Sequence, residues 1–155
     1  MPTLLIVHHT PSPATRELLE SVVAGAHDPE IDSVTVRSVP ALGATVPDVL
    51  HADGYLFGTS ANFGYMSGAL KHFFDTTYYP CLDAVATRPF GMWVHGNNDT
   101  TGAVSAIGKI VSGWGLKQAA PALEVTSVDK ATRDACYELG GTVAATLMAS
   151  GELGD

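Results

Sequence analysis

Three short stretches rich in glycine, hydroxyl and amide residues carry the side chains that could bind or react with a ligand. They are HHTPSPATR (8–16), GTSANFG (58–64) and HGNNDTTG (95–102). Hydroxyl, amide and backbone N–H groups donate hydrogen bonds without carrying charge. Pro13 suits the first turn of a helix, and a helix N-terminus attracts phosphate without needing a lysine. The first stretch therefore predicts a place for an anionic group.

The second stretch brackets small polar residues with Gly58 and Gly64. Two glycines let a planar ligand approach the backbone closely, and Phe63 could pack near a flat ring. The same glycines could equally serve turn geometry alone. Each stretch taken by itself could be an ordinary turn or cap, so the prediction depends on their meeting at one place.

Other chemistries find less support. The histidines form no i, i+4 pair and no H-E-x-x-H motif, so we expect no metal site. Cys81 and Cys136 lie far apart without C-x-x-C spacing, which favours neither a disulfide framework nor zinc. Arg88 is one residue too far from Cys81 for a C-x5-R phosphatase loop, and a buried, inert thiol is expected. The chain has no G-x-G-x-x-G and no G-K-[ST] motif, and it lacks the acidic residues of a phosphorelay receiver.

Alternating strand and helix patterns must position these stretches. Apolar or β-branched runs predict strands at 3–7, 31–39, 55–57, 90–94 and, weakly, 116–125, where Pro121 suggests a sheet edge. Helical spacing predicts helices over 13–26, 47–51, from about 66 to 75, and from 104 to Gly113 or Gly115, with a last helix capped by Asp129. The segment 78–89 is expected to be a connection.

This alternation predicts a parallel sheet covered by helices on both faces. Right-handed crossovers favour the strand order 2-1-3-4-5 for five strands. In such sheets a ligand lies in the crevice at the carboxyl ends of the strands, here the first, third and fourth. The three polar stretches follow those strands, so they should converge there.

Composition limits the class of partner. The chain has 155 residues, of which 46% are hydrophobic and 15% charged, and its net charge is −8. These values predict one compact domain over 1–155, and the negative charge disfavours nucleic acid and anionic membranes as partners. No apolar run reaches the length of a signal peptide or membrane span, so a cytoplasmic protein is expected.

The segment Ala52–Asp75, ADGYLFGTSANFGYMSGALKHFFD, resembles a motif of the flavodoxin-like NADPH-dependent FMN reductases and NAD(P)H:quinone oxidoreductases. In those proteins a strand ends in G-T/S-P-x-x-F/Y-G, and the next helix carries small-x-x-K/R-x-F-x-D. Gly58–Gly64 fits with Ser60 in place of the usual proline, and Lys71 and Asp75 fit the helix together with Phe73 or Phe74. The third stretch matches moderately and the first loosely. Many quinone reductases also carry a long insertion near the fifth strand, which is short here.

The resemblance implies a three-layer flavodoxin-like fold with a five-stranded parallel sheet and FMN as the cofactor. The residues implied to hold the FMN phosphate are His9, Thr10, Ser12, Ala14 and Thr15. Those implied to line the isoalloxazine are Thr59, Ser60, Ala61, Asn62, Phe63 and Gly64. The far side of the ring would contact His95, Gly96, Asn97 and Gly102, with His95 the ionisable residue beside it.

The resemblance also implies a function. Electrons would pass from NAD(P)H through FMN to a quinone, a flavin or a similar small-molecule acceptor, and the protein would form a homodimer. No side-chain nucleophile is needed, because flavin chemistry belongs mostly to the cofactor. Two alternatives stay open: an electron carrier that docks protein partners without turning over a nicotinamide, and a domain whose FMN site has decayed and which only binds partners.

Overall fold

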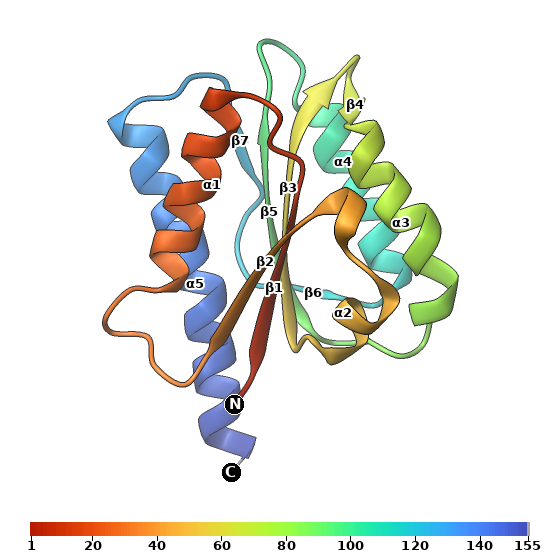
Figure 1. Ribbon diagram of the computed structural model, residues 1–155, viewed down its shortest axis with the longest axis vertical. Coiled ribbons are helices and arrows are strands. Elements are labelled where there is room, and N and C mark those ends of the chain that lie inside the picture. The colour runs from red at the N-terminus through yellow and green to blue at the C-terminus, as the bar shows by residue number, and fades with distance from the viewer. Residues whose placement is uncertain (155) are drawn as a thin grey trace.

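The computed structural model describes residues 1–154 and shows a sheet between two layers of helices (Figure 1). The elements in chain order are β1 (Thr3–His8), α1 (Pro13–Ala26), β2 (Thr35–Pro40), a 3-10 turn (Ala41–Gly43), α2 (Val46–His51), β3 (Gly54–Asn62), β4 (Tyr65–Met66), α3 (Gly68–Cys81), β5 (Pro89–His95), α4 (Thr101–Gly113), β6 (Lys117–Gln118), β7 (Leu123–Val125) and α5 (Lys130–Gly154). No helix among residues 1–154 is long and apolar enough to cross a membrane.

The parallel part of the sheet has the order β2-β1-β3-β5-β6, and β7 also pairs with β5. The predicted order 2-1-3-4-5 is therefore confirmed, with the fifth strand divided into β6 and β7. Pro121 lies between these two pieces, where its missing N–H costs no ladder hydrogen bond. The register places Leu5 beside Tyr55 and Thr59 beside Val94, so the carboxyl ends of the central strands reach one common edge.

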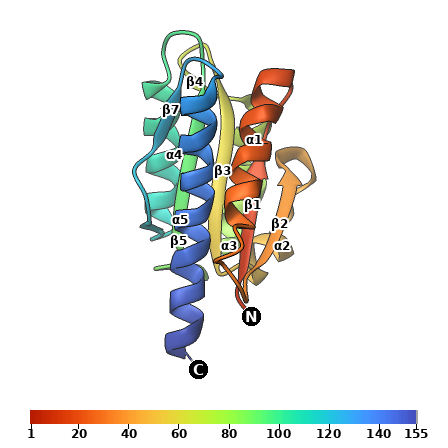
Figure 2. The same cartoon turned by 90° about the vertical axis from the view of Figure 1, so that its left-hand side faces the viewer.

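Two hydrophobic clusters, one on each face of the sheet, hold the layers together. Leu5 and Val7 of β1 point to the face covered by α2, α3 and α4, whereas Leu4 and Ile6 point to the face covered by α1 and α5. Figure 2 looks onto the layer formed by α1 and α5 and shows these two helices side by side along the sheet. The near-continuous apolar strands follow from this double coverage, since both faces of a buried parallel strand need apolar side chains.

The second polar stretch is a strand and a hairpin, where the sequence predicted a loop. β3 continues to Asn62 and turns back through Phe63 and Gly64 into β4, with Asn62 paired to Tyr65. Phe63 has φ 53° and Gly64 has φ 73°. Positive φ at both central residues is the geometry of a tight two-residue hairpin turn. The predicted strand over 55–57 was thus too short, because β5 pairs with Thr59 and Ser60 and the hairpin pairs with Ala61 and Asn62, without an apolar run.

Two other boundaries also differ from the prediction. α3 continues through Tyr78 to Cys81, where a connection was expected, and contains Pro80 in its last turn. The second strand starts at Thr35 and not at Ile31, because Ser33 adopts φ 59°, which no extended strand allows. The predicted cap of the last helix is confirmed: the Asp129 carboxylate accepts the N–H of Thr132 at 2.9 Å.

Candidate functional site

The three polar stretches meet at the carboxyl edge of the sheet, the upper edge in Figure 1. The N–H of His9 donates to the carbonyl of Gly58 at 2.9 Å, which joins the first stretch to the second. Ser60 pairs with His95, which joins the second to the third. A Cβ added to Gly102 would lie 1.8 Å from the carbonyl oxygen of Gly64, so α4 begins against the hairpin. The predicted convergence of the stretches is confirmed.

The first stretch forms a closed cap at the start of α1. The Ser12 hydroxyl accepts the N–H of Thr15 at 3.2 Å, and the Thr15 hydroxyl accepts the N–H of Ser12 at 3.0 Å. Such a capping box satisfies two helix-start donors from within the chain. Because Pro11 and Pro13 carry no N–H, the backbone donors that this stretch can direct outward are the N–H groups of Thr10 and Ala14. The side chains of His9, Thr10 and Arg16 add further donors.

Gly58 has a partner that the sequence did not suggest. A Cβ added there would lie 2.0 Å from the indole of Trp93 on the neighbouring strand β5. The flat ring that lies against Gly58 is therefore the protein's own indole. The expectation that the bare backbone of Gly58 admits a ligand is wrong, and Gly64 alone of the two glycines serves a turn.

The side chains of the second stretch divide into buried and exposed ones. The Thr59 hydroxyl is buried, donates to the carbonyl of Ser60 at 2.8 Å and accepts the N–H of Ser67 at 3.0 Å. It fixes the start of α3 and is not available to a ligand. Ser60 and Ala61 are half-buried, whereas Asn62 is exposed and Phe63 projects fully into solvent at the turn.

The third stretch is anchored by backbone and glycine contacts. The N–H of Gly96 donates to the carbonyl of Val125 at 3.0 Å, and a Cβ on Gly96 would lie 2.9 Å from that of Ala61. Gly96 and Gly102 are thus required for packing, whatever else they contact. His95 is half-buried at the end of β5, and Asn97 is exposed.

Three residues at this edge were missed by sequence reasoning. Glu124 of β7 accepts hydrogen bonds from Thr100 at 2.9 Å and Thr101 at 3.4 Å, which ties the third stretch to the edge strand. Asp99 lies beside Gly64, its carboxylate 3.2 Å from where a Cβ would stand. His8 is buried, and its Nδ1 lies 3.1 Å from the Thr10 hydroxyl. Only His8 left a signal in the sequence, as a polar residue ending an apolar run.

One titratable group at this edge, His8, has a shifted pKa. Burial lowers the pKa of His8 from its ordinary value, and the neighbouring His9 lowers it further. His8 therefore favours its neutral form in the isolated protein. Within residues 1–154 no group of three or more histidine, cysteine or acidic residues is arranged to hold a metal ion.

Both thiols are buried, as predicted for Cys81. Burial raises the pKa of both, that of Cys136 to about 11. A thiol in that state is a weak nucleophile at neutral pH.

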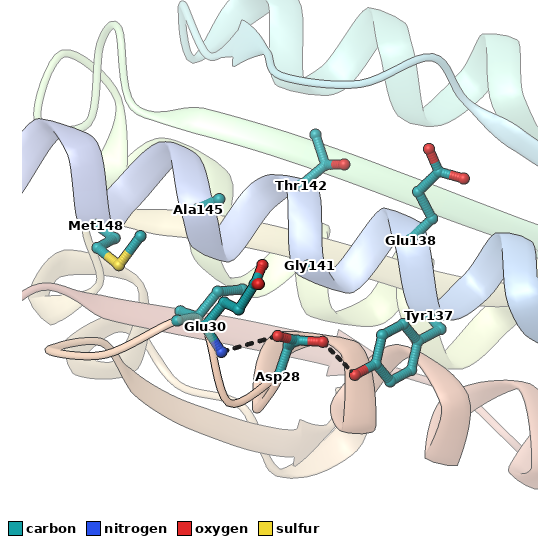
Figure 3. Close-up of a pocket in the computed structure, with 9 residues that line it drawn as sticks. Asp28, Glu30, Tyr137, Glu138, Gly141, Thr142, Ala145 and Met148 are labelled. Carbon is teal, nitrogen blue, oxygen red and sulfur yellow. Dashed lines mark hydrogen bonds between the residues drawn. The ribbon is translucent and has the colours of Figure 1, made fainter.

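Open grooves lie elsewhere on the molecule. One of about 430 Å³ runs along α5 beside the loop that follows α1, at the opposite end of the sheet (Figure 3). There Asp28 accepts the Tyr137 hydroxyl and the N–H of Glu30, and these two bonds lower its pKa. A second groove of about 400 Å³ lies between α3 and α4 and includes Tyr78 and Tyr79. Neither groove is lined by a residue of the predicted site.

Two known proteins are similar to this chain in sequence. No family model matches the chain. A flavodoxin of Aquifex aeolicus is 36% identical over 75 residues, which cover 48% of this chain and 40% of that protein. A protein of Arabidopsis thaliana named "Probable NAD(P)H dehydrogenase (quinone) FQR1-like 2" is 29% identical over 110 residues, 68% of this chain and 37% of that protein. The chain thus spans about two fifths of the length of these relatives.

Solved structures show the fold over nearly the whole chain. A flavodoxin from the domain Archaea superposes with a TM-score of 0.80 and 16% identity, covering 94% of this chain and 98% of the other. A WrbA-like flavodoxin from Agrobacterium tumefaciens gives a TM-score of 0.75 and 17% identity, covering 96% and 98%. The chain therefore has the flavodoxin-like fold, and its relatives confirm the resemblance to flavodoxin-like quinone oxidoreductases that Ala52–Asp75 indicated.

Proposed function

We propose that residues 1–155 form one FMN-binding domain that passes electrons from NAD(P)H to a quinone, a flavin or a similar acceptor. The observation that carries the proposal is the convergence of three donor-bearing stretches at the carboxyl edge of a flavodoxin-like sheet. The sequence relatives, a flavodoxin and a protein named as a quinone dehydrogenase, support the same conclusion.

The donor set at the edge suits a phosphorylated planar cofactor. The N–H groups of Thr10 and Ala14 and the Thr10 hydroxyl would receive the phosphate, because α1 is long enough to present a partial positive charge there. His9 and the capping pair Ser12 and Thr15 would shape this cradle. The Thr15 hydroxyl would not contact the phosphate, because it is already bonded to the backbone of Ser12. Thr15 would instead hold the start of α1 in place.

The ring would lie between the hairpin and the third stretch. Backbone groups of Ser60–Gly64 would face one part of it, and His95 and Asn97 another. Phe63, exposed at the turn, would cover the ring. Thr59, Gly96 and Gly102 would hold this geometry through packing. When bound, FMN supplies the capacity to accept a hydride and to release electrons, while the protein orients it and excludes water.

A direct test is to measure FMN binding and its reduction. The purified protein should bind FMN more tightly than riboflavin, because only FMN carries the phosphate. Thr10→Val removes one hydrogen bond to a charged group, worth about 1.5–3 kcal/mol. It should lower the affinity for FMN at least tenfold without changing the affinity for riboflavin. Thr146→Val, on α5 far from the edge, is the matched control. Equal affinity for FMN and riboflavin would contradict the phosphate assignment.

An electron carrier is the second candidate, favoured by the flavodoxin relative and the net charge of −8. Anaerobic addition of NADH or NADPH separates the two candidates. Rapid bleaching of bound FMN supports the reductase, and no bleaching within minutes supports the carrier. The homodimer and the cytoplasmic location stay predictions, the former testable by analytical ultracentrifugation.

A further inference from the structure

His8 is a buried polar residue that the proposed function does not use. It ends β1, between Pro40 of β2 and Gly58 of β3, neither of which offers a hydrogen-bonding side chain. Its side chain is only 9% exposed, and its hydrogen bond runs from Nδ1 to the hydroxyl of Thr10 at 3.1 Å. Thr10 is also the residue whose hydroxyl would face the phosphate. A titratable group is thus bonded directly to a proposed ligand contact.

The direction of this hydrogen bond depends on the imidazole. When Nδ1 carries no proton, it accepts the hydroxyl hydrogen of Thr10, and that hydrogen cannot be given to anything else. When the ring is protonated, Nδ1 donates to the Thr10 oxygen, and the hydroxyl hydrogen is released. A released hydrogen can then be donated to an anion, which a neutral His8 with its proton on Nε2 would prevent.

We propose that His8 is a positioning residue that couples the hold on the FMN phosphate to protonation, through the Thr10 hydroxyl. The inference rests on the proposed function and adds a dependence of FMN affinity on pH, set by His8 and Thr10. Retention of FMN should strengthen as the pH falls.

In the isolated protein, burial and one neighbouring residue favour the neutral form of His8. His9 is the adjacent titratable group and disfavours the protonated form of His8, as burial does, so the pKa of His8 is lowered in the isolated protein. The helices on this side of the sheet carry Arg16 and Glu17 in α1 and Arg133 in α5. Arg133 pairs with Glu17, and burial and His9 alone account for the shift of the His8 pKa. The paired strand residues Pro40 and Gly58 do not titrate.

A bound phosphate would favour the protonated form of His8 and raise its pKa. Affinity must then increase as the pH falls through the pKa of the complex, and level off below the lower pKa of the isolated protein. Each pKa unit between the two states corresponds to about a tenfold difference in FMN affinity.

The test is an NMR titration of the histidine side chains in the full chain, alone, with FMN and with riboflavin. We expect FMN, but not riboflavin, to raise the pKa of His8 by about one unit, the tenfold coupling above. His51, at the end of α2 and away from this edge, should not move and serves as the internal reference. FMN binding without a shift of His8 would overturn the inference and leave the proposed function intact. No FMN binding at all would overturn the proposed function itself.

Variants test the same coupling through affinity. The side-chain amide of His8→Asn can donate to Thr10 at every pH, so the ratio of its FMN dissociation constant to that of the wild type should change by about tenfold between pH 8 and pH 5. The phosphate takes up a proton near pH 6, but this titration is common to both proteins and cancels in the ratio. A constant ratio would overturn the inference. If His8→Asn does not fold, Thr10→Val should abolish the same pH dependence.

His9→Gln separates the two neighbouring histidines. In this variant the shift of the His8 resonance by FMN should persist. Its disappearance would assign the coupled proton to His9 and overturn the role of His8.

Discussion

At the scale of single residues, the close approach of Gly58 to Trp93 explains a feature that the sequence left open. The indole occupies the space where any Cβ at position 58 would stand, 2.0 Å away from one of its ring atoms. Trp93 is itself only 1% exposed and packs with Leu56 and Val125 in the cluster under α1 and α5. The ring therefore has little room to move aside, and position 58 must remain glycine for the sheet to pack.

Gly58→Ala should consequently destabilise the fold. Overpacking of a dense core costs about 1–3 kcal/mol, and urea denaturation should show that loss as a lower midpoint with an unchanged slope.

Gly68→Ala is the matched control, because no atom lies within 4 Å of a Cβ at that position in the first turn of α3. It should leave the stability equal or slightly higher, since alanine is the better helix former. Equal stabilities of the two variants would show that the indole relaxes freely.

At the scale of elements, α1 and α5 pack so closely that their backbones touch. A Cβ on Gly25 would lie 1.8 Å from the carbonyl oxygen of Tyr137, and one on Gly140 would lie 2.0 Å from that of Val22. Backbone atoms cannot rotate away as a side chain can. The contact therefore fixes the distance between the two helices and, with it, where α1 starts relative to the carboxyl edge.

Gly140→Ala should force these helices apart and cost on the order of 1–3 kcal/mol. The neighbouring Gly141→Ala is the control, because its nearest atom would lie at 3.4 Å, an ordinary contact. Within a helix, alanine in place of glycine should add about 0.5–1 kcal/mol. Thermal unfolding of the two variants should thus move in opposite directions, and a loss of the same size in both would contradict the backbone contact.

The start of α2 gives a pH-dependent prediction. Burial tends to raise the pKa of Asp48, but hydrogen bonds from the Thr45 N–H and the Arg37 guanidinium outweigh it, so the pKa is lowered overall. A carboxyl whose pKa is lower in the folded state stabilises the fold above its unfolded pKa, about 3.9, and loses that contribution as the pH falls through the folded value.

Asp48→Asn should therefore lower the free energy of unfolding by about 1 kcal/mol at pH 7 and by much less near pH 3. Chemical denaturation at the two pH values measures the difference. Asp83→Asn is the control, since Asp83 is exposed in a turn with φ 66°, a conformation that asparagine also adopts. A loss at position 48 that is equal at both pH values would show that the charge is not involved.

At the scale of the whole molecule, the carboxyl edge brings together segments from four separate parts of the chain. Hydrogen bonds link the first stretch to β3 and the third stretch to β7, while α4 abuts the hairpin. A ligand held there would contact the three polar stretches at once and should stabilise the entire fold.

FMN at one hundred times its dissociation constant should add about 2.7 kcal/mol to the free energy of unfolding. For a chain of this size that corresponds to a rise in Tm of roughly 5–10 °C. Differential scanning calorimetry measures it, with riboflavin at the same concentration expected to give the smaller rise. No shift with saturating FMN would contradict binding at this edge.

The candidate site was only partly accessible to sequence reasoning. The types of donor in 8–16 and 95–102 could be seen, because hydroxyl and amide residues after apolar strands are local features. Whether a hydroxyl such as that of Thr59 faces outward or bonds to Ser67 depends on a neighbour eight residues away. The hairpin at 63–64 was missed because Phe63 gives no propensity for positive φ.

The layered α/β fold, its parallel strand order and the meeting of three polar stretches at one edge could be predicted from the sequence. The physical reason is that hydrophobic periodicity, helix caps and the handedness of crossovers are properties of short segments. Three contacts could be seen only in the folded protein: Trp93 fills the space at Gly58, α1 touches α5 through glycines, and His8 bonds to Thr10. Such contacts follow from close packing, because the atoms that meet come from segments whose separation along the chain carries no local signal.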